Sequence, residues 1–198
     1  ATQAVLPLRG KILNVASASS SKLADNQLLS DLIQALGCGT GTRYREEDLR
    51  YDKVIIMTDA DVDGAHIAAL LMTFFFREMP QLIEAGHLYL AQPPLFRLSA
   101  GGEVAYARDE ADRDRLLAGH FNGKKVEISR FKGLGEMSAR QLRETTMDPA
   151  TRKLEQVRID PETGELAGDL VERLMGRRPE LRLAFIQENA RFVEELDV

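Results

Sequence analysis

The sequence has only one cysteine, no long apolar run and no excess of positive charge. Cys38 alone excludes an internal disulfide and indicates a reducing compartment. No stretch reaches the roughly 18 apolar residues of a transmembrane helix, so we expect no membrane span. The opening residues, ATQAVLPLRGK, lack an initiator methionine and the layout of a signal peptide, which is typical of a cut inside a larger protein. These absences together predict a cytoplasmic chain.

The composition is that of a globular chain that can build a core. Its 198 residues are 44% hydrophobic and 29% charged, enough for one large domain or a domain with an appendage. A formal net charge of −5 argues against binding nucleic acid over the whole surface. DNA contact would need local basic clusters, each of which is equally typical of a solvated face. The candidate pairs are Arg9 with Lys11, Arg130 with Lys132, Arg140 with Arg143, and Arg177 with Arg178.

Local patterns in the first half of the chain predict an α/β fold. The apolar residues 53–57 are typical of a strand that is buried on both faces. A helix is expected over 64–79 with a break at Pro80, and residues 87–98 predict a second strand. Strand, helix and strand in this order predict a right-handed βαβ unit with a parallel sheet.

Several other elements have clear end signals. A helix is expected over 27–36, with Asn26 as its N-cap and Gly37 as its stop. After residue 95 the pattern changes to short strands and helices. A hairpin turn is expected at Gly101 and Gly102, and Ser138 with Gln141 forms the pattern of a capping box. A last helix is expected to start at Pro179. It carries a core-facing apolar stripe of Leu181, Phe185, Phe192 and Leu196.

Three aspartates, Asp59, Asp61 and Asp63, follow the first predicted strand within five positions. Charges of one sign this close repel one another, which costs free energy unless a ligand or partner offsets the repulsion. The calcium loop of an EF-hand is excluded, because its twelfth position requires a glutamate and is occupied here by Leu70.

Three interpretations of the aspartates stay open. Carboxylates at the C-terminal end of a parallel strand suit Mg²⁺ and chemistry at a phosphodiester. An Asp-x-Asp after a strand is also how haloacid-dehalogenase-like phosphatases begin. The third interpretation is a helix N-terminus that tolerates acidic residues, in a non-catalytic module for docking another protein chain. His66, one turn into the helix, can be a metal ligand, a phosphate contact or a packing residue.

Five segments together resemble a known family. They are PLRGKILNV (7–15), IIMTDADVDGAHI (55–67), GHLYLAQPPLFRL (86–98), RFKGLGEM (130–137) and TTMDPATRKLEQV (145–157). In order and spacing they resemble the C-terminal part of the B subunit of bacterial type IIA topoisomerases, the family of DNA gyrase and topoisomerase IV. The match covers essentially the whole chain. RFKGLGEM, with Phe131, and the compact stretch before it look closer to the topoisomerase IV branch than to gyrase.

The resemblance implies a Toprim domain, a parallel α/β sheet that binds Mg²⁺ beside the DNA strand to be cut. We expect this domain over residues 1–98, without its first strand, and a smaller α+β tail subdomain over 99–198. Mn²⁺ or Ca²⁺ can substitute for Mg²⁺. By this mapping Asp59 and Asp61 are the catalytic residues and main metal ligands, with Asp63 ligating or close by, and the DNA-binding residues are Arg9, Lys11, His66 and Lys132.

The resemblance also implies partners outside this chain. The nucleophile is a tyrosine of the A subunit, in a heterotetramer of two A and two B subunits that relaxes or decatenates double-stranded DNA. ATP acts through an N-terminal domain, and a catalytic glutamate of the family lies upstream of Pro7, before this chain begins. We therefore expect a nucleoid-associated, cytoplasmic enzyme whose isolated fragment binds magnesium weakly and does not cleave DNA.

Overall fold

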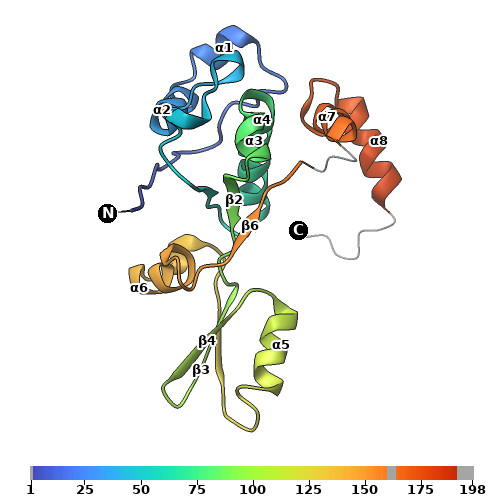
Figure 1. Ribbon diagram of the computed structural model, residues 1–198. Helices are drawn as coiled ribbons and strands as arrows, with labels where there is room; N and C mark the ends of the chain where they lie inside the picture. Colours follow the sequence, from blue (N-terminus) through green and yellow to red (C-terminus); the bar gives the residue numbers. More distant parts are fainter. Residues whose placement is uncertain (1, 160–163, 191–198) are drawn as a thin grey trace. The chain divides into compact units, whose positions relative to one another are not determined.

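The computed structural model of the chain describes residues 2–159 and 164–190, which form a mixed α/β fold (Figure 1). The predicted α/β class is thereby confirmed. Its contacts divide the chain into two compact units. The first consists of Ala1–Val54, His66–Leu88 and Gln156–Val198, and the second of Ile55–Ala65 and Tyr89–Glu155. No helix in the described ranges combines the length and the apolar character needed to cross a membrane.

One sheet has three strands in the order β1-β2-β6, namely β1 (Val54–Ile56), β2 (Leu88–Ala91) and β6 (Leu154–Gln156). The strand β1 confirms the strand expected at 53–57, whereas β2 covers only the first part of the strand expected over 87–98. The sequence did not predict β6. The N–H of Gln92 donates to the carbonyl of Lys153 at 3.0 Å, and that of Val157 donates to the carbonyl of Leu88 at 2.9 Å. Because these bonds join opposite ends of the two strands, β6 runs antiparallel to β2.

The first unit is built mainly from helices. They are α1 (Ser20–Ala24), α2 (Gln27–Leu36), most of α3 (Val62–Glu78), α4 (Pro80–Glu84), α7 (Gly164–Met175) and α8 (Pro179–Asn189), with short 3₁₀ turns at Gly41–Arg43 and Glu46–Asp48. Their apolar faces form a core whose buried side chains include Leu29, Leu32, Leu36, Phe74, Phe75, Met79 and Leu82. Cys38 is buried as well, and burial raises the pKa of its thiol. A buried thiol of raised pKa is a packing residue rather than a nucleophile.

Helix α2 has both predicted ends. The side chain of Asn26 accepts a hydrogen bond from the N–H of Leu29 at 3.1 Å. Gly37 ends the helix in the left-handed region, with φ of 82°. Pro80 also acts as expected, because it opens α4 as a separate helix after α3. These ends depend only on residues within one turn, which is why the sequence predicts them.

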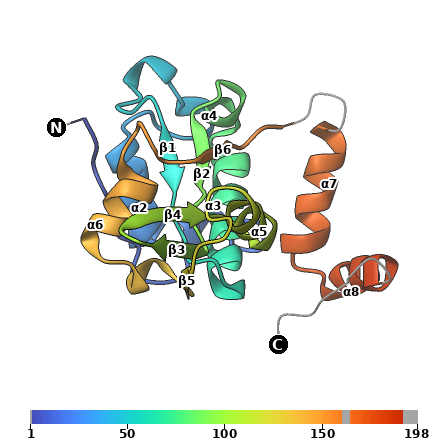
Figure 2. The same cartoon turned by 90° about the horizontal axis from the view of Figure 1, so that it is seen from below.

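The second unit contains an antiparallel sheet in the order β4-β3-β5, with β3 (Phe96–Ala100), β4 (Glu103–Ala107) and β5 (Glu127–Arg130). The predicted hairpin turn is confirmed, since Gly101 and Gly102 join β3 to β4 with φ of 58° and 90°. Figures 1 and 2 show α5 (Glu110–Ala118) beside this sheet. The core beneath α5 comprises Phe96, Leu98, Ala100, Ala107 and Phe121, with Leu116 and Leu117 packed against it.

Short helical segments complete the second unit: η3 (Leu134–Glu136), α6 (Ala139–Leu142) and the π-helical η4 (Arg143–Met147). The capping box of Ser138 and Gln141 is present at the start of α6.

In the first unit, α8 starts at Pro179 as predicted. Its apolar stripe is not a buried core face, because Leu181 and Phe185 are only partly buried. Phe192 and Leu196, the other members of the stripe, lie outside the described residues.

Candidate functional site

Asp59, Asp61 and Asp63 lie at the junction of β1 and α3, and all three are exposed. Asp61 is the N-cap of α3. Its Oδ1 accepts the N–H of Gly64 at 2.6 Å, and its carbonyl accepts the N–H of Ala65 at 2.9 Å. Asp63 lies in the first turn, where a negative charge interacts favourably with the helix dipole. The helix-cap interpretation therefore holds for Asp61, because α3 starts at Val62, two residues before the start expected from the sequence.

Two substitutions distinguish the capping hydrogen bond of Asp61 from the effect of its negative charge. Asp61→Ala is expected to lower the free energy of unfolding by about 1 kcal/mol, because the N–H of Gly64 loses its acceptor. Asp61→Asn keeps an acceptor oxygen and should stay close to the parent protein. Urea denaturation of both variants measures the difference. Equal destabilisation by alanine and asparagine would show that the charge, not the cap, stabilises the helix.

Gly64 is required by a close approach of the backbone. A Cβ atom at this position would lie 2.1 Å from the carbonyl oxygen of Asp59, so only glycine lets the aspartate loop fold back on the start of α3. The glycine that made the motif resemble a calcium loop thus has a steric role in this turn.

The segment KGLGEM (132–137) contacts Asp59 directly. The N–H of Leu134 donates to Oδ1 of Asp59 at 2.8 Å, across 75 positions of sequence. A Cβ atom on Gly133 would lie 2.8 Å from Cγ of Asp59 and 2.9 Å from its Oδ1. The glycine thus leaves room for the carboxylate, and the next amide binds it. Sequence analysis missed this contact because it treated Lys132 only as a DNA contact; the glycine beside it was the available signal.

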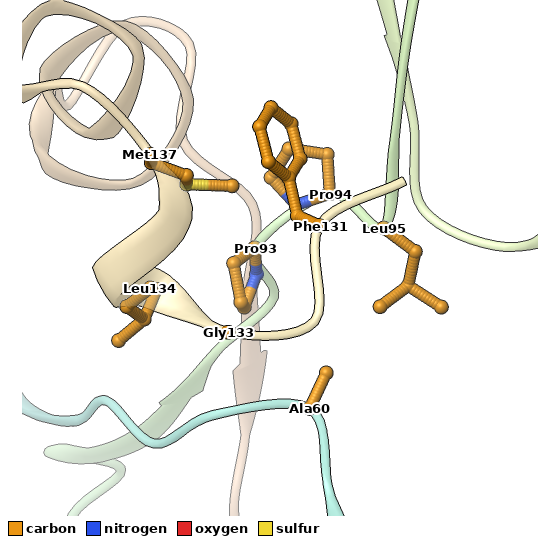
Figure 3. A pocket seen from close by; sticks show the side chains of 8 residues that line it. All are labelled: Ala60, Pro93, Pro94, Leu95, Phe131, Gly133, Leu134 and Met137. Carbon is orange, nitrogen blue, oxygen red and sulfur yellow. The ribbon is translucent and has the colours of Figure 1, made fainter. Parts of the chain in front are cut away.

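The KGLGEM segment is held in place at both ends. The carboxylate of Glu136 accepts the N–H of Lys132 at 2.7 Å, which closes the loop on itself. Phe131 and Met137 are buried, and the N–H of Phe131 donates to the carbonyl of Leu95 at 2.8 Å. Figure 3 shows the small apolar pocket around them, lined by Ala60, Pro93, Pro94, Leu95, Phe131, Gly133, Leu134 and Met137. Apolar packing therefore fixes the loop that holds Asp59.

The three aspartates do not converge on one point. Within residues 2–159 and 164–190, no group of three or more His, Cys, Asp or Glu side chains is arranged to hold a metal ion. Mg²⁺ does not need three ligating side chains, since it binds one or two carboxylates and completes its coordination shell with water and phosphate oxygens. The Oδ1 atoms of Asp59 and Asp61 each accept a hydrogen bond from a backbone N–H. The Oδ2 atom of each carboxylate is therefore compatible with binding a metal. The donor chemistry therefore fits Mg²⁺ through two carboxylates and not through a cage of three.

The predicted DNA-binding residues are all exposed. Arg9 and Lys11 flank Gly10, whose φ is 130°, in the first unit. Lys132 lies in the loop that holds Asp59, in the second unit. His66 is exposed in the first turns of α3, so it is not the packing residue that we also considered.

The other basic pairs differ in their surroundings. Arg140 is ion-paired with Glu144 at 2.7 Å, which raises the pKa of the guanidinium and fits a solvated charged face. The guanidinium of Arg130 lies 5.9 Å from the ring centre of Phe96. Arg177 donates through Nε to the carbonyl of Ser17 at 2.6 Å. Of these three arginines, only Arg140 has a carboxylate partner among the described residues.

Comparisons with known proteins identify the class of the chain and then its family. Residues 1–93 match the Toprim domain, and residues 123–187 match the carboxyl terminus of the DNA gyrase B subunit. The chain is 64% identical to the DNA topoisomerase 4 B subunit of Caulobacter vibrioides and 62% identical to that of Bartonella bacilliformis, over 99% of the chain in each case. It is 47% identical to the DNA gyrase B subunit of Metamycoplasma hominis, also over 99% of the chain.

The chain belongs to the family of type IIA topoisomerase B subunits, on the topoisomerase IV side. It spans 28% of the length of the two topoisomerase 4 relatives and 30% of the gyrase relative. The resemblance inferred from the five sequence motifs is confirmed.

Proposed function

We propose that this chain is the magnesium-binding, DNA-contacting part of a topoisomerase IV B subunit, which supports cleavage and religation of double-stranded DNA by a tyrosine of the A subunit. The observation that carries the proposal is the bond from the N–H of Leu134 to Asp59. It joins a carboxylate suited to a metal with a loop whose exposed Lys132 suits a phosphate. A metal ligand and a phosphate contact in one loop cluster are what cleavage of a phosphodiester requires.

Asp59 and Asp61 would hold Mg²⁺, for which Mn²⁺ or Ca²⁺ can substitute, with Asp63 nearby in the first turn of α3. When bound, the metal supplies charge stabilisation at the scissile phosphate and the leaving 3′ oxygen. The amide of Leu134 orients Asp59 for that task. Arg9, Lys11, His66 and Lys132 would neutralise backbone phosphates, which positions DNA without reading its sequence.

The whole protein would work as a cytoplasmic, nucleoid-associated heterotetramer of two A and two B subunits, with ATP bound outside this chain. Within the chain we propose a Toprim domain over residues 1–98 and a tail subdomain over 99–198. The full-length B subunit with its A partner is expected to decatenate DNA with ATP more efficiently than it supercoils it. Predominant supercoiling would instead assign the protein to the gyrase branch.

The isolated chain is expected to be inactive. Mixed with the A subunit and Mg²⁺, it should leave plasmid DNA uncut under conditions in which the full-length B subunit gives linear product. The reason is that Asp59 and Asp61, held at separate points, bind Mg²⁺ weakly by themselves, whereas the resemblance implies a further catalytic glutamate in the full-length B subunit. Gel analysis of plasmid cleavage measures this. Robust cleavage by the isolated chain would contradict the prediction.

A further inference from the structure

The first unit contains a second polar site, which shares His66 with the proposed DNA contacts but includes neither the three aspartates nor Lys132. It is an open pocket of about 520 Å³. Its polar lining comes from three separate segments of the chain: Asn14 and Ser17, His66 of α3, and Arg177 and Arg182 around the start of α8. Of the basic pair Arg177 and Arg178, only the first lines the pocket.

The walls of this pocket are fixed by hydrogen bonds to backbone carbonyls. Arg177 donates through Nε to the carbonyl of Ser17 at 2.6 Å, and Arg182 donates through Nη1 to that of Gly176 at 2.7 Å. The amide nitrogen of Asn14 donates to the carbonyl of Met175 at 2.9 Å. Both guanidinium groups are therefore oriented before any ligand binds, which reduces the entropy lost on binding.

The lining of the pocket carries two guanidinium groups, and the carboxylate of Glu172 lies beside Gly176. No acidic side chain is among its lining residues. The carboxylate of Glu172, one turn before Gly176, is ion-paired with Arg77 at 2.9 Å. Within the described part of the chain, neither Arg177 nor Arg182 has a carboxylate within ion-pair distance. Each guanidinium has five N–H donors, and its bonds to the backbone leave others for a ligand.

We propose that this pocket binds the oxyanion of a phosphate or phosphate ester. Two oriented guanidinium groups, with the amide of Asn14 and the imidazole of His66 in the same lining, match the several acceptor oxygens of a phosphate. The pocket is also larger than a bare ion requires, so it admits a phosphate with a group attached. The phosphate can belong to a DNA backbone or to a small molecule. The site involves none of the aspartates and goes beyond the proposed cleavage chemistry.

The test is a titration of the ¹⁵N-labelled chain with inorganic phosphate in EDTA, followed by the Arg Nε–Hε signals in NMR spectra. The parent chain should show saturable shifts. Arg177→Gln should weaken phosphate binding by about tenfold, the effect of one charge-assisted hydrogen bond. The matched control is Arg178→Gln, which removes an exposed charge next to the pocket and should bind phosphate like the parent. Ser17→Asp puts a carboxylate into the pocket and should abolish binding.

Equal weakening by Arg177→Gln and Arg178→Gln, or no saturation in the parent chain, would overturn the proposal, because diffuse surface charge would then explain any shift. Adding a short DNA duplex identifies the source of the phosphate. Displacement of inorganic phosphate by the duplex assigns the pocket to the DNA backbone, and retention assigns it to a small phosphate ester. The titration contains no divalent metal, so it can succeed even if the proposed cleavage function fails.

Discussion

Asp59→Asn in the full-length B subunit is expected to lower Mg²⁺-dependent DNA cleavage by about a thousandfold. Asparagine keeps an oxygen that can accept the N–H of Leu134, which now binds Oδ1 of Asp59 at 2.8 Å. The loop should therefore keep its structure while the negative charge that would bind the metal is lost. Removing a group that stabilises charge at a reacting phosphate typically costs two to three orders of magnitude. Single-turnover cleavage of a labelled duplex, with the A subunit present, measures the effect.

Asp52→Asn is the matched control for this experiment. Asp52 is exposed just before β1 and bonds to the neighbouring Lys53, and it belongs to none of the proposed sites. It should cleave DNA like the parent protein. Unfolding of both variants by urea should remain within the error of the parent. Normal cleavage by Asp59→Asn would favour a docking role toward another chain, in which the aspartates only shape a helix N-terminus.

The sequence predicts the elements whose ends are fixed by their own neighbours. Asn26 and Gly37 bound α2, and Ser138 with Gln141 opens α6, because caps form within one turn of the chain. The turn at Gly101 and Gly102 follows from the backbone freedom of glycine. In these places local preference and final structure agree, and no distant contact is needed to choose between alternatives.

The start of α3 shows where local reasoning stops. The sequence suggested a start near residue 64, but the helix begins at Val62 and includes Gly64 in its first turn. The sequence placed Gly64 at the first position of the helix, but it is the third helical residue in the structure. The carbonyl oxygen of Asp59 packs against Gly64 at a distance that excludes a Cβ atom. The cap consequently falls on Asp61 and not on Asp63.

Contacts between distant segments were not predictable from local patterns. β6 has few apolar residues and becomes a strand by pairing with β2. The bond from Leu134 to Asp59 spans 75 residues, and periodicity carries no information at that separation. The motifs themselves marked both partners, TDADVDG and KGLGEM, but not their contact. The aspartates as metal ligands and the basic residues as DNA contacts therefore remain predictions that rest on chemistry and family membership.

The contact between Gly133 and Asp59 leads to the second large effect. Gly133→Ala in the full-length protein is expected to lower DNA cleavage by about a hundredfold with little change in stability. The backbone of Gly133 is extended, with φ of −166°, so alanine causes no backbone strain. Its Cβ would, however, lie within 3.1 Å of Cγ and both oxygens of the Asp59 carboxylate. The exposed carboxylate can rotate away and lose the N–H of Leu134, and a shift of about 1 Å in a catalytic group can cost a factor of about 100.

Gly135→Ala is the control, since a Cβ atom there has no neighbour within 4 Å. It should cleave DNA like the parent, although it changes the same loop by the same methyl group. If Gly133 acts through Asp59, adding Gly133→Ala to Asp59→Asn should lower cleavage little further, because the metal-binding charge is already gone. Equal losses from the two alanine variants, or fully additive losses in the double variant, would show that KGLGEM serves cleavage by another route, such as its contact with DNA through Lys132. Non-additivity would instead establish that the loop acts by holding the carboxylate.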